Sequence, residues 1–145
     1  MIYTKITRIA LRICFDAHKE QLDKTGLPYV FHPFHLAEQM TSEGACVCAL
    51  LHDVMEDTPI TREELEEMGI PREYTDILTL LCHKDGVPYM DYVKTLAQNR
   101  IAREVKIADL RHNSDLSRLD NIDEHMLERQ EKYRIALEYL LSIGE

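Results

Sequence analysis

Residues 45–60 constrain the fold of this chain more than any other stretch, because they join an apolar run to a cluster of polar residues. The run extends from Ala45 to Leu51, and Pro59 ends the pattern. A run with no polar side predicts a helix that is buried on all sides. At about 100° per residue, the polar residues that follow cover an arc of roughly 140° on one helix face. They are His52, Asp53, Glu56 and Asp57.

Three of these polar residues are carboxylates near the C-terminal end of the predicted helix. The helix dipole disfavours anions there, and burial removes their solvation, so the carboxylates repel one another. A bound cation resolves this repulsion, with His52 and Asp53 as ligands and Glu56 and Asp57 beside them for chemistry. The alternative is a helix end that emerges into water and leaves the carboxylates solvated. The helix by itself leaves both interpretations open.

The rest of the chain shows helical spacing of apolar residues and no strand-like alternation, so we expect an all-α fold. A length of 145 residues predicts one domain, residues 1–145. Pro33 suits a first helical turn, Thr61 with Glu64 has capping-box spacing, and Asp120 and Asn121 are candidate caps of the last helix. The bundle of about eight helices is expected at 3–20, 33–42, the central helix up to Pro59, 61–69, 71–82, 89–99, 100–112 and a last helix after 121.

Charge and cysteine usage limit the classes of partner and compartment. The net charge of −9 argues against binding to nucleic acid or to an acidic membrane surface, and an anionic small substrate would need a local metal ion and a few basic side chains. The cysteines form no Cys-x-x-Cys pair and lie in apolar helical stretches, which indicates buried free thiols in a reducing compartment. No signal peptide or membrane-spanning run is recognised, so we expect a cytoplasmic protein.

Two further stretches hold candidate partners for the central helix. His32 precedes Pro33 at a predicted helix start, a position where a histidine is more often a core or capping residue. Asp109 lies within an apolar strip, and an acid there is costly unless it is paired or binds a metal ion. His112 and Asn113 follow Asp109 at i+3 and i+4, on roughly the same helix face.

Taken together, these residues resemble the HD superfamily of metal-dependent phosphohydrolases. More narrowly, they resemble the hydrolase domain of the RelA/SpoT family and its stand-alone small alarmone hydrolases. The matching motifs extend over almost the whole chain: AlaHis (17–18), ThrGlyLeuProTyr (25–29), HisPro (32–33), LeuLeuHisAspValMetGluAspThr (50–58) and LysIleAlaAspLeuArgHisAsn (106–113).

The resemblance implies a metal centre. Its ligands would be His32, His52, Asp53 and Asp109. Two imidazoles and two carboxylates suit a divalent ion such as Mn²⁺, and the same set also accepts Zn²⁺, Fe²⁺ or Co²⁺.

The resemblance also assigns roles around that centre. Glu56 and Asp57 match the acid–base pair of the family, which handles the proton of the attacking water and that of the leaving oxygen. Asn113 matches a substrate-contacting position, and Lys24 can serve a phosphate. We expect His112, directly before Asn113, to be a packing or hydrogen-bonding residue.

The chain departs from the family pattern around the expected base pocket. The alarmone hydrolases have an ArgLys pair whose arginine stacks on guanine, whereas this chain has Asp23-Lys24, and a carboxylate cannot stack as a guanidinium does. SerAspLeu replaces the usual continuation after Asn113. His83-Lys84 could supply a compensating cation, although a solvated loop is the more common interpretation of such a pair.

We therefore expect a metal-dependent phosphohydrolase that removes the 3′-pyrophosphate of guanosine tetra- or pentaphosphate, the alarmone of the stringent response. The alternatives are a phosphohydrolase of another nucleotide or phosphorylated cofactor, and a non-catalytic nucleotide-binding sensor. No nucleotide-synthesising domain is expected in this chain, so the protein would degrade the signal. The sequence carries no pattern that predicts one oligomeric state over another.

Overall fold

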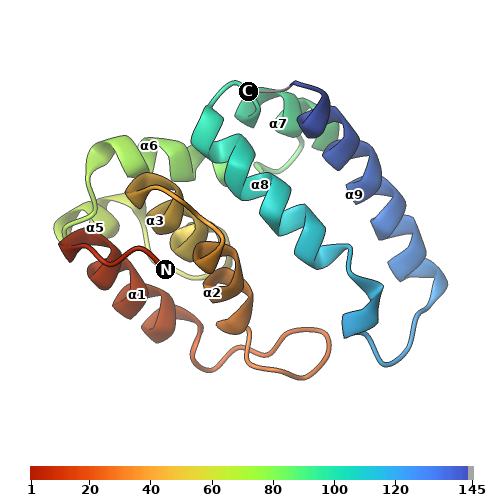
Figure 1. Ribbon diagram of the computed structural model, residues 1–145, viewed down its shortest axis with the longest axis horizontal. Coiled ribbons are helices and arrows are strands. Elements are labelled where there is room, and N and C mark those ends of the chain that lie inside the picture. The colour runs from red at the N-terminus through yellow and green to blue at the C-terminus, as the bar shows by residue number, and fades with distance from the viewer. Residues whose placement is uncertain (144–145) are drawn as a thin grey trace.

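The computed structural model describes residues 1–143. These residues form a bundle of α-helices with one 3-10 turn and no β-strand (Figure 1), which confirms the predicted all-α fold. The elements are α1 (Lys5–His18), α2 (Phe31–Glu38), α3 (Glu43–Leu51), α4 (Val54–Asp57), α5 (Arg62–Glu67), α6 (Arg72–Leu81), α7 (Tyr89–Leu96), α8 (Arg100–Asn113), the 3-10 turn η1 (Leu116–Arg118) and α9 (Glu124–Ser142).

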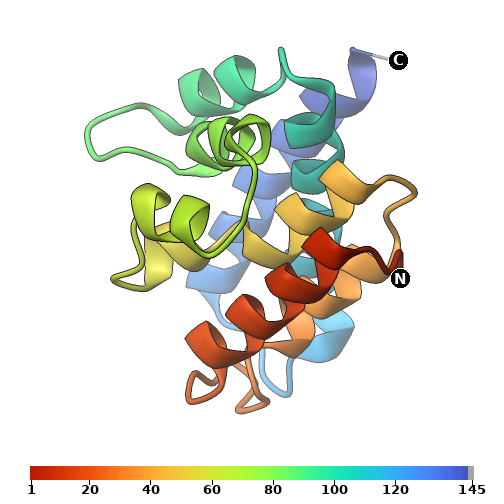
Figure 2. The ribbon, with the colours of Figure 1, turned by 90° about the vertical axis from the view of Figure 1, so that its left-hand side faces the viewer.

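Helix α3 forms the centre of the bundle, as the apolar run predicts. Each residue from Gly44 to Leu51 is buried. The helix contacts α1, α2, α6 and α8 (Figures 1 and 2). Gly44 permits one of these close approaches, since a Cβ atom there would lie 2.9 Å from a ring carbon of Tyr74. The burial of α3 on all sides fixes its C-terminal end in the protein interior.

The central helix is shorter than predicted, because it ends at Leu51 and a separate turn, α4, carries Glu56 and Asp57. The His52 side chain explains the interruption. Its Nδ1 donates to the Ala49 carbonyl at 2.7 Å and thereby competes with the backbone N–H that would continue the helix. The prediction of one continuous polar arc over residues 52–57 is therefore wrong.

Capping and proline patterns in the sequence predicted some of the other helix termini correctly and others wrongly. The predicted capping box of Thr61 and Glu64 is present at the start of α5. Pro33 lies in the first turn of α2, although that helix begins two residues earlier than expected. The predicted caps of the last helix, Asp120 and Asn121, are wrong. Asp123 caps α9 instead, because its side chain accepts from the Met126 N–H at 2.8 Å.

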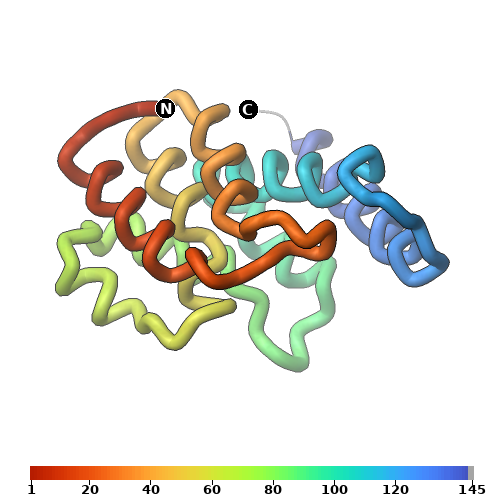
Figure 3. Tube along the Cα trace, turned by 90° about the horizontal axis from the view of Figure 1, so that it is seen from below, coloured from red at the N-terminus to blue at the C-terminus, as the bar shows by residue number. Residues whose placement is uncertain are grey.

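Two loops at one end of the bundle prepare the site. The segment between α1 and α2 (19–30) approaches the segment between α8 and α9 (114–123), as Figures 1 and 3 show.

The cysteines in the described residues are free thiols, as predicted: Cys14, Cys46 and Cys48 are buried and Cys82 is half-buried. None of the helices within residues 1–143 combines the length and the apolar character needed to cross a bilayer.

Candidate metal centre and adjoining pockets

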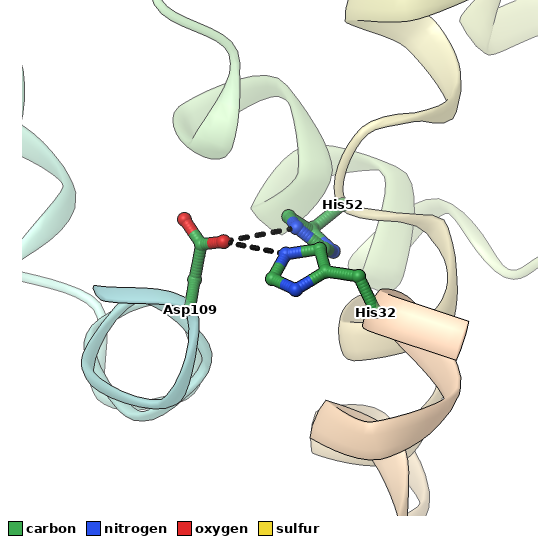
Figure 4. Close-up of side chains that lie close together, drawn as sticks. All are labelled: His32, His52 and Asp109. Carbon is green, nitrogen blue, oxygen red and sulfur yellow. Dashed lines mark hydrogen bonds and ion pairs between the residues drawn. The ribbon is translucent and has the colours of Figure 1, made fainter. Parts of the chain in front are cut away.

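Three buried side chains from distant parts of the chain converge beside the end of α3 (Figure 4). His32 comes from α2, His52 follows α3, and Asp109 lies on α8. Asp109 Oδ1 is 2.8 Å from His32 Nε2 and 3.4 Å from His52 Nε2. Atoms that bind one ion at about 2.1 Å and at right angles lie about 3 Å apart, so this spacing suits a single metal ion.

The chemistry of His52 also fits a cation at this point. Since Nδ1 donates to the Ala49 carbonyl, Nε2 is the nitrogen that faces the cluster. Nε2 is buried and has no hydrogen-bond partner within residues 1–143, yet it is 3.0 Å from Asp53 Oδ2. Burial opposes a charge on His52, but Asp53 and Asp109 outweigh it and raise the His52 pKa well above its ordinary value. A proton or a metal ion is therefore strongly favoured at Nε2.

Asp53 lies beside this cluster rather than within it. The grouped ligand atoms are those of His32, His52 and Asp109. Asp53 Oδ2 faces His52 and accepts a hydrogen bond from the Tyr29 hydroxyl. The role of Asp53 as a fourth ligand stays a prediction.

A second layer of side chains orients the ligands. Lys106 Nζ donates to Asp109 Oδ2 and the Asn113 amide donates to Asp109 Oδ1, each at 3.0 Å. Burial would raise the pKa of Asp109, but the charge of Lys106, the hydrogen bond with His32 and the nearby His52 hold this pKa well below its usual range. His32 Nδ1 is 2.6 Å from His112 Nδ1, which confirms His112 as a hydrogen-bonding residue. Such partners fix the orientation of a metal-binding side chain.

Glu56 and Asp57 reach the solvent at the rim of the cluster. Glu56 accepts from the His83 backbone N–H at 3.1 Å. Partial burial, followed by the negative charge of Asp53, raises the pKa of both carboxyls, although the His83 N–H opposes this at Glu56. A raised pKa brings a carboxyl closer to the range in which it can exchange a proton at neutral pH.

Two pockets adjoin the cluster. The larger one has a volume of about 410 Å³, and we call it the nucleoside pocket after the ligand class proposed for it below. The smaller one, the lysine pocket, has about 210 Å³. Asp57 lines the nucleoside pocket and Glu56 lines the lysine pocket, while Asn113 and Tyr133 border both. The predicted substrate residue Lys24 lies in the nucleoside pocket.

The nucleoside pocket shows how Asp23 is accommodated. Arg118 Nη2 is 3.6 Å from Asp23 Oδ2, and Arg118 Nη1 donates to the His112 carbonyl at 2.8 Å. A guanidinium therefore lies in this pocket, but it comes from the segment after α8. His83 and Lys84 do not line this pocket, and Lys84 is exposed, as expected of a solvated loop.

Sequence reasoning missed several residues of the site. Lys106 could have been found, because it precedes Asp109 by three residues and therefore shares its helix face. Tyr29 was part of a recognised motif without an assigned role. Arg118 and Arg129 carried no signal, since their place in the nucleoside pocket depends on how α9 and the preceding segment pack.

Comparisons with known proteins identify sequence relatives of this chain. A guanosine-3′,5′-bis(diphosphate) 3′-pyrophosphohydrolase of Haemophilus influenzae is 36% identical over 123 residues, which cover 70% of this chain and 17% of the relative. A GTP pyrophosphokinase of Myxococcus xanthus is 32% identical over 140 residues, 85% of this chain and 18% of the relative. The chain is an HD-type, RelA/SpoT hydrolase-like domain.

The fold of this HD domain is also that of a solved structure. A protein described as a metazoan orthologue of SpoT that hydrolyses ppGpp superposes with a TM-score of 0.75 at 22% identity, covering 98% of this chain and 86% of that one. No protein-family model matches the chain. The bifunctional (p)ppGpp synthase/hydrolase SpoT of Escherichia coli is 31% identical over 66% of this chain, which spans 14% of that relative. The HD domain thus spans less than a fifth of the length of these curated relatives.

Proposed function

We propose that this HD domain is a metal-dependent hydrolase that removes the 3′-pyrophosphate from guanosine tetraphosphate (ppGpp). The observation that carries the proposal is the buried His32, His52 and Asp109 cluster at the edge of a nucleotide-sized pocket. Relatives named for this activity support the choice of substrate. The net charge of −9 supports a small-molecule substrate and disfavours nucleic acid and membrane partners.

The metal ion would be held by His32, His52 and Asp109, with Asp53 as the fourth ligand. We propose Mn²⁺, which accepts mixed imidazole and carboxylate ligands. When bound, such an ion supplies a Lewis acid for a phosphate oxygen and lowers the pKa of a water molecule. The hydrogen bonds from Lys106 and Asn113 keep Asp109 in place for this task.

Proton transfer belongs to Glu56 and Asp57. In the proposed reaction, a water oxygen forms a bond to the phosphorus next to the ribose, and the bond between that phosphorus and the ribose 3′-oxygen breaks. One carboxyl of the pair accepts the proton of the water and the other supplies a proton to the 3′-oxygen, so that GDP and pyrophosphate leave. Lys24, which lines the nucleoside pocket, and Asn113, which borders both pockets, would hold the substrate phosphates and ribose.

A second candidate function is hydrolysis of another nucleotide or a phosphorylated cofactor. The ion pair between Asp23 and Arg118 favours it, because the guanidinium enters the nucleoside pocket from a different side than the family pattern implies. A non-catalytic sensor is the weakest candidate, because the sequence retains Glu56, Asp57 and each of the proposed metal ligands. We further propose that one domain comprises residues 1–145 and that the protein acts in the cytoplasm, where such nucleotides occur.

The test is a Mn²⁺-supplemented hydrolysis assay on ppGpp, other nucleotides and phosphorylated dinucleotides, with identification of the products. We expect GDP and pyrophosphate from ppGpp, and a loss of at least about 100-fold in turnover for Glu56→Gln with its metal content unchanged. If ppGpp stays intact while another compound is cleaved, the second candidate function replaces the first. If Glu56→Gln retains the wild-type rate, its acid–base role is refuted.

A further inference from the structure

The carboxylate of Asp23 lines the nucleoside pocket with one oxygen held by the chain and the other unused. Oδ1 accepts hydrogen bonds from the Thr25 N–H at 2.8 Å, the Thr25 hydroxyl at 2.6 Å and the Leu27 N–H at 3.0 Å. Oδ2 lies 3.6 Å from Arg118 Nη2, and no residue within 1–143 donates a hydrogen bond to it. Oδ2 is therefore an acceptor that remains available to a ligand in this pocket.

Backbone hydrogen bonds fix the position of this carboxylate. The Asp23 N–H donates to the Leu27 carbonyl at 2.8 Å, and the Gly26 N–H donates to the Asp23 carbonyl at 3.1 Å. Gly26 has a φ of 85°, a left-handed conformation that glycine adopts at little cost. Because the loop and the side chain are already ordered, a ligand that binds Oδ2 loses little free energy to ordering them.

The charge of Asp23 restricts the part of a nucleotide that can contact it. Burial would raise the pKa of Asp23, but the hydrogen bonds from Thr25 and Leu27 and the charge of Arg118 lower it, so the carboxyl is ionised at neutral pH. An ionised carboxylate accepts hydrogen bonds and donates none. Since it repels phosphate groups, its partner must be an uncharged part of the nucleotide that carries N–H or O–H donors.

The apolar side chains of the pocket favour a base over a ribose as that partner. Leu22, Leu116 and Leu119 line the pocket together with Asp23. A base can bury its flat faces against such side chains while its edge forms hydrogen bonds. Guanine has two adjacent donors on one edge, N1–H and the 2-amino group, whereas adenine has the acceptor N1 there. A carboxylate oxygen thus complements guanine and repels adenine.

We propose that Asp23 determines the base specificity of the site, because the carboxylate of its pair with Arg118 accepts from the N1–H and the 2-amino group of guanine. The base would be recognised through its edge, on the loop where the family pattern places a stacking arginine. This inference rests on the proposed function, since it takes guanosine as the nucleoside.

The test is calorimetric titration of Mn²⁺-loaded protein with GDP and, separately, with xanthosine diphosphate, each corrected by a blank titration without protein. Xanthine carries an oxygen in place of the 2-amino group of guanine, and this oxygen would face Oδ2 of Asp23. We therefore expect the wild type to bind xanthosine diphosphate at least about tenfold more weakly than GDP, the lower end of the range for a hydrogen bond to a charged group.

Asp23→Asn should reverse this preference. Three donors surround the Oδ1 position, so the amide oxygen should take that place and the amide NH₂ group should take the place of Oδ2. The variant then presents a donor to the base. It should bind GDP about tenfold more weakly and xanthosine diphosphate more tightly than the wild type, a gain that a damaged fold would not produce.

Asp115→Asn is the matched control. Asp115 lines the same pocket and holds a similar turn, because its Oδ1 accepts from the Ser117 N–H at 3.0 Å, but the residue is exposed. This variant should preserve the ratio of the two affinities. The role of Asp23 is refuted if the wild type fails to bind GDP or binds both nucleotides within about twofold, if the ratio survives in Asp23→Asn, or if Asp115→Asn changes it equally.

The Asp23→Asn variant also separates base recognition from the proposed function. Hydrolysis of ppGpp by the wild type, with a base preference that Asp23→Asn leaves unchanged, would refute the role of Asp23 alone. A preference for GDP that depends on Asp23, in a protein that does not hydrolyse ppGpp, would support base recognition and refute the proposed function.

Discussion

Binding of a divalent ion should release about one proton from His52 at neutral pH. Asp53 and Asp109 raise the pKa of His52 well above 6.5 against the opposing effect of burial, so the metal-free protein carries a proton on this ring. A metal ion requires the neutral imidazole and must displace that proton. The structure thus predicts competition between one proton and one metal ion for Nε2.

The size of the pH dependence of metal affinity follows from the linkage between proton binding and metal binding. Below the raised pKa of His52, each unit of pH should strengthen metal binding about tenfold, or about 1.4 kcal/mol. The stability of the metal-free fold depends on pH in the opposite direction. Because the folded pKa is the higher one, protonated His52 contributes its full stabilisation below the ordinary pKa of 6.5, and this is lost as pH rises through the raised value.

Calorimetry measures this proton release directly. Titration of Mn²⁺ into metal-free protein in two non-coordinating buffers of different ionisation enthalpy gives the number of protons released. Asp53→Asn is the informative variant, because it removes the first of the charges that raise the His52 pKa and should reduce proton release above pH 7. Metal binding between pH 6 and 7 that releases no proton and whose affinity does not change with pH would contradict a protonated His52 in the metal-free protein.

Three further perturbations test other parts of the site. His112→Ala should weaken metal binding about 10- to 100-fold in a metal titration, because it removes the partner of His32 Nδ1, and unchanged affinity would contradict this role. Arg118→Asp should raise the KM for ppGpp through repulsion by Asp23, and the swapped pair Asp23→Arg with Arg118→Asp should recover it; no recovery would show that the pair does not serve the pocket. Gly44→Ala should lower the free energy of unfolding by about 1–3 kcal/mol in urea, whereas wild-type stability would mean that the packing around α3 adapts.

Two residues of the metal cluster stand out in the sequence because each is anomalous in its own surroundings, whereas His32 was assigned only through the family resemblance. Asp109 interrupts an apolar strip, and His52 follows a fully apolar run, so each requires a partner that its neighbours do not supply. The geometry of the central helix could not be predicted in the same way. The competition between His52 Nδ1 and the backbone for the Ala49 carbonyl depends on a rotamer that periodicity does not report.

The pockets were less predictable for a different reason. Arg118 and Asp23 are nearly a hundred positions apart and pair only because two irregular segments meet beside α2. Lys132 lies on α9, where the sequence pattern does not distinguish one charged residue from another. Only the packing of α9 places this one over Tyr89.

The hydrogen bond that Asp109 Oδ2 accepts from Lys106 has a consequence for the ion itself. Lys106 engages Oδ2, so only Oδ1 points to the histidines. This carboxylate would then bind a metal ion through one oxygen and not through both. With one carboxylate oxygen committed to Lys106, an ion held here would remain available to supply Lewis-acid chemistry to a phosphate oxygen and to a water molecule.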